Sequence, residues 1–390
     1  MILLVIIGGL MMLLAILYAL IIFGALTGLS LPSGNITSSP GQLPVVSVII
    51  PVRNEENRLL LCLASLSKQD YPFGKVELLI SDDFSEDRTC EIAERFIQQH
   101  PQQTWILVKG DPELPSGSGK KAAIARAIHL ASGSLILTTD GDTQHSSSWI
   151  SSMVHGYHTT GARMVLGPVM FSETKGVFGH MQTLEFLGVM GLTAGFANIG
   201  RAIMCNGANL CYEKTTFYQT GGFDGNEQFA SGDDQFLLWK IKRLYGGGAI
   251  RFLDDRDAIV TTLPAQGVKP FFQQRFRWIS KSRGYRDPLV TGVGLVSYLF
   301  QAMILAGFSL GFLSPLYLYL AVLLLAFKLL IDLPLVFSMA RFFNKLNLWK
   351  WYIPAQLFQV LYVTVSGPMA FLIPVKWKGR RVSSFTFRIS

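Results

Sequence analysis

The stretch that decides the fold is Ser134–Asp142, SLILTTDGD, a short apolar run that ends in two aspartates. In an extended chain, residues two apart point to the same side, so the carboxylates of Asp140 and Asp142 converge beyond the end of the strand. Open α/β sheets bind their ligands at that edge. The stretch therefore indicates a site for a metal ion and a diphosphate, although an Asp-x-Asp pair also occurs in solvated turns.

Alternating strand and helix patterns surround this stretch. Short β-rich runs predict strands at Val46–Ile50, Val76–Ile80, Trp105–Val108 and Leu135–Thr139. Helical patterns are found at Glu55–Lys68, Asp87–Gln99, Lys120–Ala131, Ser148–His158, Met181–Gly191, Asp233–Tyr245 and Lys269–Arg283. Strands that alternate with helices predict an α/β domain with a mostly parallel, doubly wound sheet.

Composition places this domain in a membrane protein. Half of the residues are hydrophobic, 15% are charged, and the mean hydropathy is +0.36. Residues 1–29 are uncharged and long enough to cross a hydrocarbon core of about 30 Å, and they lack the features of a cleaved signal peptide. Further spans are expected at Leu289–Leu313, Leu316–Val336 and Trp351–Ile373. We therefore expect a transmembrane anchor at 1–29, a linker at 30–44, a soluble domain at 45–288, two or three spans within 289–375, and a basic tail at 376–390.

Basic residues flank the soluble domain, at Arg275–Arg286, Arg341–Lys350 and Lys376–Arg381. Because positively charged segments resist translocation, they predict that this domain lies on the cytoplasmic side. We expect an integral protein of a bacterial inner membrane. If all three C-terminal segments crossed, the basic tail would end on the wrong side, so one of them is expected to be interfacial or re-entrant. Trp351–Ile373 is one candidate. The net charge of +8 favours contact with anionic membrane lipids rather than nucleic acid.

Further polar groups follow the other predicted strands. The first strand runs into Pro51-Val-Arg-Asn-Glu55, and the second ends in Ser81-Asp-Asp83. Both bring polar groups to the edge where a nucleotide binds in such sheets. Asp83 is also a common type of turn residue, so its pattern alone leaves both interpretations open. Much later come Gly232-Asp-Asp234 and Gln274-Arg-Phe-Arg-Trp278. The second of these also has the composition of an interfacial anchor.

This series resembles the inverting family 2 glycosyltransferases, the group that contains cellulose, chitin, hyaluronan and poly-N-acetylglucosamine synthases and the ceramide glucosyltransferases. The resemblance covers about Val45 to Arg283. It rests on five elements in the family's order, namely Pro51-x-x-Asn54-Glu55, Asp82-Asp83, Asp140-x-Asp142, Gly232-Asp233-Asp234 and Gln274-x-x-Arg277-Trp278. Three shorter matches reinforce it, at Gly119–Ala123, Asn206–Asn209 and Gly221–Asp224. One departure is Asp233, where the family usually has Glu before the catalytic Asp.

The resemblance implies a GT-A type nucleotide-sugar-binding domain and a role for each matching residue. Asp234 would be the general base, and Asp142 would ligate Mg²⁺ or Mn²⁺ on the diphosphate of a UDP-sugar. Asp83 would contact the uracil or ribose, and Arg277 would supply positive charge near the diphosphate. Trp278 would offer a flat face to an acceptor sugar. The complete set of substrate-binding residues implied is Pro51, Asn54, Glu55, Asp83, Lys120, Asp140, Asp233, Gln274, Arg277 and Trp278.

The expected activity is transfer of a hexosyl or N-acetylhexosaminyl group from a UDP-sugar to a lipid-linked or saccharide acceptor at the cytoplasmic membrane face. Attack opposite the UDP gives a β-linkage. Two alternatives stay open: a processive synthase that extends and secretes a polymer, and a non-enzymatic membrane scaffold with a degenerate transferase domain. The few polar residues in the predicted spans make a poor conduit for a monomer, which favours transfer without translocation. A homo-oligomer or an accessory subunit could complete a channel.

One pair of charges stands out within the apolar spans. Lys328 and Asp332 lie four residues apart inside Leu316–Val336, so on a helix they share a face and can form an ion pair. We expect either a packing role for this pair or a role in lining the acceptor's route along the helix bundle.

Overall fold

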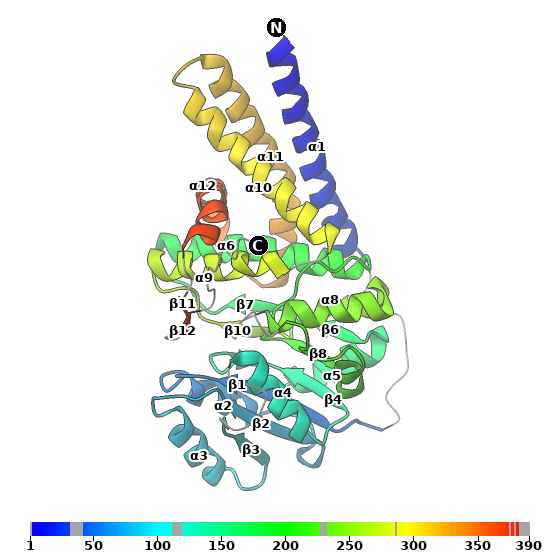
Figure 1. The fold of residues 1–390 in the computed structure, drawn as a ribbon. Helices are drawn as coiled ribbons and strands as arrows, with labels where there is room; N and C mark the ends of the chain where they lie inside the picture. Colours follow the sequence, from blue (N-terminus) through cyan, green and yellow to red (C-terminus); the bar gives the residue numbers. More distant parts are fainter. Residues whose placement is uncertain are drawn as a thin grey trace, which may run out of the picture.

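The computed structural model describes residues 2–31, 42–110, 119–226, 232–284, 287–373, 376–377 and 380–381. Most of the expected linker and basic tail therefore lie outside the described residues. Figure 1 shows an α/β domain at one end of the molecule, a layer of nearly horizontal helices above it, and long helices that rise from this layer.

A seven-stranded sheet forms the centre of the α/β domain, in the order β3-β2-β1-β4-β8-β6-β9. Its strands are β1 Val46–Val52, β2 Val76–Asp82, β3 Thr104–Val108, β4 Leu135–Thr138, β6 Met164–Leu166, β8 Leu210–Glu213 and β9 Ile250–Phe252. Strands β1 to β4 pair in parallel, β8 is antiparallel to both β4 and β6, and β6 is parallel to β9. The prediction of a mostly parallel sheet is confirmed, with β8 as the one reversed strand within it.

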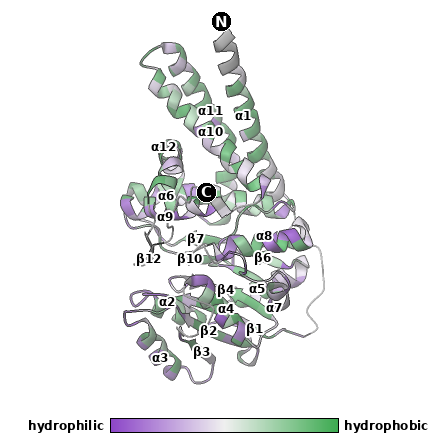
Figure 2. Ribbon diagram, viewed as in Figure 1, coloured by the Kyte–Doolittle hydropathy of each residue, from purple (hydrophilic) through white to green (hydrophobic). Residues whose placement is uncertain are grey.

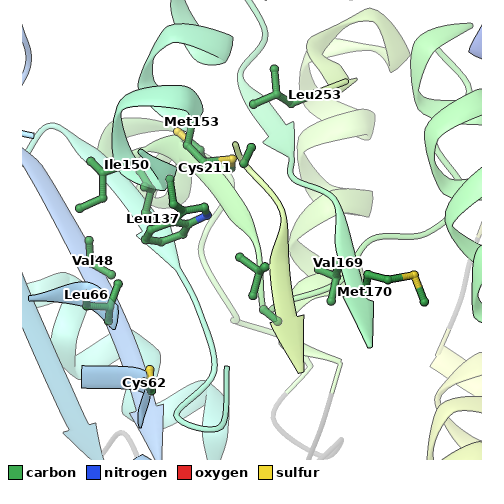
Figure 3. Packing of buried hydrophobic residues seen from close by; sticks show 14 of the residues in the cluster. Val48, Cys62, Leu66, Leu137, Ile150, Met153, Val169, Met170, Cys211 and Leu253 are labelled. Atoms are coloured by element: carbon green, nitrogen blue, oxygen red, sulfur yellow. The ribbon is translucent and has the colours of Figure 1, made fainter. Parts of the chain in front are cut away.

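Alternation along the strands divides the core into two layers. On β1, Val48 and Ile50 belong to one buried cluster, and Ile49 belongs to the other. Figure 3 shows the first cluster, in which Val48 and Leu137 lie near Leu66 and Ile150. The helices of the domain are α2 Leu59–Leu66, α3 Thr89–Gln99, α4 Lys120–Leu130, α5 Trp149–Thr160, α7 Lys214–Gln219 and α8 Asp233–Tyr245. Burial on both faces explains why the strands are apolar runs rather than alternating ones.

A smaller sheet lies beside the larger one and extends it towards the helical layer. It contains β5 Gln144–His145, β7 Val169–Phe171 and β10 Val260–Thr262, in the order β5-β10-β7. A two-residue pair, β11 Lys376–Trp377 with β12 Arg380–Arg381, lies near the C-terminus. The small sheet was not predicted, because strands of two or three residues are too short to show a period.

Two helices form the layer between the sheets and the long helices: α6 Gly176–Asn198 and α9 Val268–Ser280. The sequence predicted only the middle of α6, because the helix is buried on several sides and shows little amphipathic pattern. Helix α6 crosses α1 very closely. A Cβ added to Gly195 would lie 2.1 Å from the carbonyl oxygen of Ala25, so only glycine fits this crossing.

Four helices are long and apolar enough to cross a membrane, over Gly8–Leu29, Pro288–Leu310, Pro315–Phe342 and Leu346–Leu372. They correspond to α1 Ile2–Leu29, α10 Pro288–Leu310, α11 Pro315–Phe342 and α12 Tyr352–Leu372, with a short 3-10 turn before α12. Figure 2 shows that α1, α10 and α11 are largely hydrophobic along their described length. Helix α12 packs against α6 and α9 as well as α10, so it is tied closely to the horizontal layer.

Candidate active site

Two adjoining cavities open at the carboxyl ends of the central strands. The large cavity has a volume of about 470 Å³ and extends from β4 and α8 to α9. The small cavity, of about 120 Å³, lies over the ends of β1 and β2. Lys120, Asp140, Asp142 and Arg277 line both cavities, so the two form one continuous site. This is the sheet edge that the Ser134–Asp142 stretch predicts.

The loop that carries Asp140 and Asp142 is held by partly buried hydrogen bonds. The Thr143 hydroxyl donates to the Asp140 carbonyl oxygen over 2.6 Å. His145 contacts the Thr139 hydroxyl through Nε2 at 2.8 Å and the Ser65 hydroxyl through Nδ1 at 3.0 Å. Burial lowers the pKa of His145 to about 3, so the ring is neutral and acts as a hydrogen-bonding brace. Sequence reasoning did not find this brace, because no motif marks it.

Asp83 lies at the end of β2 and is almost fully buried. The backbone N–H of Gly119, which has a φ of +111° that favours glycine, donates to its carboxylate over 2.6 Å. Arg53 donates to the Asp83 carbonyl oxygen at 2.6 Å. These contacts fix Asp83 in the lining of the small cavity.

Lys120 lies between the two sets of acidic residues. Its ammonium is 2.6 Å from an Asp140 oxygen and 3.5 Å from an Asp233 oxygen. Burial disfavours the charged form, but the carboxylates of Asp140 and Asp233 outweigh it and raise the pKa of Lys120. The lysine is therefore a fixed positive charge between β4 and the start of α8.

Asp234 occupies the first turn of α8 and faces the large cavity. It accepts hydrogen bonds from the backbone N–H groups of Gln235 at 2.8 Å and Gly207 at 3.1 Å, and Lys281 lies 3.9 Å away. Burial works to raise the pKa of this carboxyl, but Lys281, Lys120 and the two N–H groups outweigh it, so the pKa lies below its usual value. The carboxylate is thus ionised at neutral pH and can accept a proton.

Asp142 forms an ion pair with Arg58 at 3.3 Å, and both side chains are partly exposed to the cavity. No group of three or more His, Cys, Asp or Glu side chains within the described part of the chain is arranged to hold a metal ion. The donor set nevertheless fits Mg²⁺ or Mn²⁺ in a nucleotide site, because such ions are held by one or two carboxylates together with phosphate oxygens and water. Asp142, with Asp140 beside it, would be those carboxylates.

Helix α9 forms the wall of the large cavity that faces the membrane helices. Gln274, Arg277 and Trp278 line this wall from successive turns of the helix. Burial lowers the pKa of the Arg277 guanidinium, while the charges of Asp140, Asp233, Asp234 and Asp142 act in the opposite direction. The motif at the end of the globular domain thus lines the same cavity as the acidic residues.

Most of the site residues named from the sequence meet in these cavities. Pro51, Glu55 and Asp83 line the small cavity, and Asp233 and Asp234 line the large one. Asn54 lines neither cavity. It has a φ of +50°, and its side chain accepts a hydrogen bond from the Glu86 backbone N–H at 2.9 Å, so it holds the turn after β1.

Several lining residues were not found from the sequence. They include the basic residues Arg58 and Lys281, the aromatic residues Phe171 and Phe186, and the loop 262–266. Lys281 follows Trp278 by three residues, which is about one helical turn. This spacing places the two side chains on the same helix face and could have indicated Lys281 from the sequence. Together with Lys120 and Arg277, Arg58 and Lys281 balance the four aspartates that line the large cavity.

The chain matches two family models that overlap. Residues 47–218 match the glycosyl transferase family 2, and residues 135–363 match the glycosyl transferase family group 2, which covers more than half of the chain. The fold, with an acidic edge on a nucleotide-binding type of sheet, is of the GT-A class. The chain belongs to the glycosyl transferase family group 2.

Individual relatives agree with this assignment. The chain is similar to an N-acetylglucosaminyltransferase of Rhizobium meliloti, with 29% identity over 64% of this chain and 59% of the relative. It is also similar to the glycosyltransferase AglE of Haloferax volcanii, with 28% identity over 60% of this chain and 72% of that one. The alignment with the first of these relatives thus spans less than two thirds of that relative's length.

A solved structure supports the fold. The mannosyltransferase PcManGT from Pyrobaculum calidifontis, in complex with GDP-Man and Mn²⁺, superposes with a TM-score of 0.56 at 18% identity. The match covers 92% of this chain and 97% of that one, so the shared fold includes the helices beyond the α/β domain.

Proposed function

We propose that this protein is an inverting glycosyltransferase that moves N-acetylglucosamine or a similar sugar from a UDP-sugar to an acceptor at the membrane surface. The observation that carries the proposal is the convergence of Asp140, Asp142 and Asp234 with Lys120 and Arg277 around one cavity. The names of the bacterial relatives supply the sugar class. The resemblance to the family supplies the UDP donor and the inversion.

In this proposal each residue acts from its observed position. The nucleoside lies in the small cavity against Asp83, and the diphosphate lies between Lys120 and Arg277, where positive charge stabilises the departing UDP. Asp142 would hold a divalent cation, which would supply further positive charge to that leaving group. Asp234 faces the large cavity and removes the proton of an acceptor hydroxyl as it attacks the anomeric carbon.

The wall of the large cavity formed by Gln274, Arg277 and Trp278 of α9 is called the acceptor wall below. Its position favours a lipid-linked or short saccharide acceptor. Helix α9 lines the large cavity and packs against α12, so an acceptor bound there lies next to the membrane helices. The cavity among α1, α6, α11 and α12 has a volume of only about 60 Å³, room for a few water molecules. A sugar polymer does not fit that space, which supports transfer without translocation by a single chain.

We further propose the membrane arrangement expected from the sequence. The globular domain, about 45–288, would face the cytoplasm of a bacterial cell, with the anchor and the spans in the inner membrane. The packing of α12 against the horizontal layer supports its assignment as the interfacial segment, which would return the basic tail to the cytoplasmic side.

The test is to incubate the purified protein with a panel of radiolabelled UDP-sugars and membrane lipid, and then to separate lipid-linked from polymeric products. We expect one or a few N-acetylhexosamine residues on a lipid or a short saccharide. A long polymer made by this chain alone would overturn the preference for transfer without translocation. No transfer or donor hydrolysis with any UDP-sugar would favour the scaffold alternative. Asp254→Asn, an exposed substitution outside both cavities, is a matched control for later variants.

A further inference from the structure

A buried polar cluster joins the cavity wall to the membrane helices. Arg275, on the face of α9 turned away from solvent, forms an ion pair with Glu185 of α6. The other carboxylate oxygen of Glu185 accepts a hydrogen bond from the Tyr362 hydroxyl of α12 over 2.5 Å. All three side chains are at least 94% buried. One ion pair and one hydrogen bond thus tie three helices together behind the cavity wall.

The same arginine holds the aromatic side chain that faces the cavity. Its guanidinium lies over the ring of Trp278 at 4.2 Å and over the ring of Phe271 at 4.8 Å. The Nε and Nη1 groups of Arg275 have no hydrogen-bond acceptor among the described residues, so the charge depends on Glu185 and on these ring faces. If Glu185 were displaced, Arg275 and Trp278 would have to move together.

We propose that Arg275, Glu185 and Tyr362 are positioning residues that couple helix α12 to the acceptor wall of the active site. Arg275 touches no part of either cavity, but Gln274, Arg277 and Trp278 on either side of it line the large one. A shift of α12 is transmitted through the Tyr362 hydroxyl to Glu185, then to Arg275 and Trp278. The nucleoside end of the site is not on this path, because Asp83 follows β2 and lines the small cavity. Arg277 of α9 lines both cavities, so the diphosphate end lies closer to the path.

The expected effect on sugar transfer rests on the proposed function. The expected effect on the position of α9 does not. Loss of the coupling should impair transfer to a saccharide acceptor, which needs Trp278, more than hydrolysis of the donor, in which water is the acceptor. A misplacement of about 1 Å can lower a rate up to about 100-fold. A merely structural cluster would lower both reactions to the same degree, through loss of folded protein.

The experiment compares Tyr362→Phe with Tyr352→Phe in the chain of 390 residues. Both residues belong to α12, are about 5% exposed, and donate one hydrogen bond, Tyr352 to the Leu329 carbonyl oxygen at 2.7 Å. Only Tyr362 reaches the cluster. The first readout is hydrogen exchange of α9 residues 268–280, and the second is the ratio of transfer to donor hydrolysis, with UDP binding measured by calorimetry.

We expect Tyr362→Phe to speed exchange in α9 and to lower the transfer-to-hydrolysis ratio by about 10-fold or more, with UDP affinity falling by less than that ratio. Tyr352→Phe should change neither readout. Unchanged α9 exchange in Tyr362→Phe would overturn the coupling, whatever the activity. If α9 exchange rises but wild-type protein transfers no sugar from any UDP-sugar, the coupling stands and the proposed function fails. Glu185→Gln, which keeps a hydrogen-bond acceptor for Tyr362 but removes the charge opposite Arg275, should show the larger effect of the two cluster variants.

Discussion

The two sides of the active-site cavity are built in different ways. On the donor side, Asp83, Asp140 and Asp142 lie at or just beyond the ends of strands β2 and β4. Hydrogen bonds to the Asp83 carboxylate and to the Asp140 carbonyl oxygen hold this edge. On the acceptor side, Trp278 and Gln274 come from a helix whose orientation depends on α6 and α12. The donor side therefore rests mainly on strand ends of the central sheet, whereas the acceptor side depends on the packing of separate helices.

This difference suggests that one side of the cavity serves nucleotide binding and the other serves acceptor binding. A nucleotide diphosphate is the same in every turnover, so a site fixed by strand ends suits it. The acceptor must arrive from the membrane, so a wall that is tied to the membrane helices suits it. Variants of the two sides should accordingly separate binding of UDP from transfer to the acceptor.

The largest effect is expected from Asp234→Asn. A general base acts on the acceptor, so its loss should lower transfer by about 10²- to 10⁴-fold and leave UDP affinity nearly intact. The asparagine side chain can still accept the hydrogen bond from Gly207, which limits structural disturbance. Turnover assays and calorimetry with UDP measure the two quantities, with Asp254→Asn as the control. A variant that keeps more than about a tenth of wild-type activity would remove Asp234 from the role of base.

Asp142→Ala should lower both UDP affinity and the rate of transfer, unlike Asp234→Asn. Because the carboxylate is proposed to ligate the metal ion, UDP affinity in the presence of Mn²⁺ should fall together with the rate. UDP affinity measured in EDTA should change little. Calorimetry with and without Mn²⁺ checks this, and Asp254→Ala is the matched control. Full wild-type activity in EDTA would show that the metal assignment is wrong.

A buried ion pair lies among the membrane helices, beyond the acceptor wall. The expected Lys328–Asp332 ion pair is confirmed at 2.8 Å, and the structure adds contacts from Lys328 to Gln356 and Gln359 and from Tyr18 to Asp332. Removing one partner of such a buried pair typically costs about 3–5 kcal/mol. Lys328→Leu alone should therefore reduce the yield of folded protein more than the Lys328→Leu, Asp332→Leu double variant.

The same double variant tests whether this pair serves only packing. Expression and thermal unfolding in detergent measure stability, and transfer per folded molecule measures function. We expect the double variant to keep transfer activity. Normal folding with strongly reduced transfer would instead place the pair on the route of the acceptor.

The smallest effect is a shift in pH dependence. Lys281 and Lys120 help to hold the pKa of Asp234 below its usual value, so the base stays ionised until the pH falls below that range. Lys281→Met removes one of these charges, which should raise the pKa of Asp234 and move the acidic limb of kcat/KM to higher pH. Lys269→Met, on α9 but outside the cavity, is the control. An unchanged acidic limb would mean that Asp234 does not control it.

The sequence predicted the donor side well. The strands β1, β2 and β4 and the residues at their ends were placed correctly, because burial on both faces makes each strand a continuous apolar run. The acceptor side was predicted only through the motif at Gln274–Trp278. Phe186 and the loop 262–266 belong to this wall, but they lie in segments with no motif and reach the site only through the path of the chain.

By itself, then, the sequence determined the family, the parallel sheet, the acidic edge and the apolar helices, because each of these depends on residues close together in the chain. Only the tertiary structure decided that Asn54 holds a turn, that His145 braces the acidic loop, and that Arg275 joins α9 to Glu185 and Tyr362. The last contact spans 177 residues between Glu185 and Tyr362. No local period or spacing encodes such a meeting, since it exists only when three separate helices pack against one another.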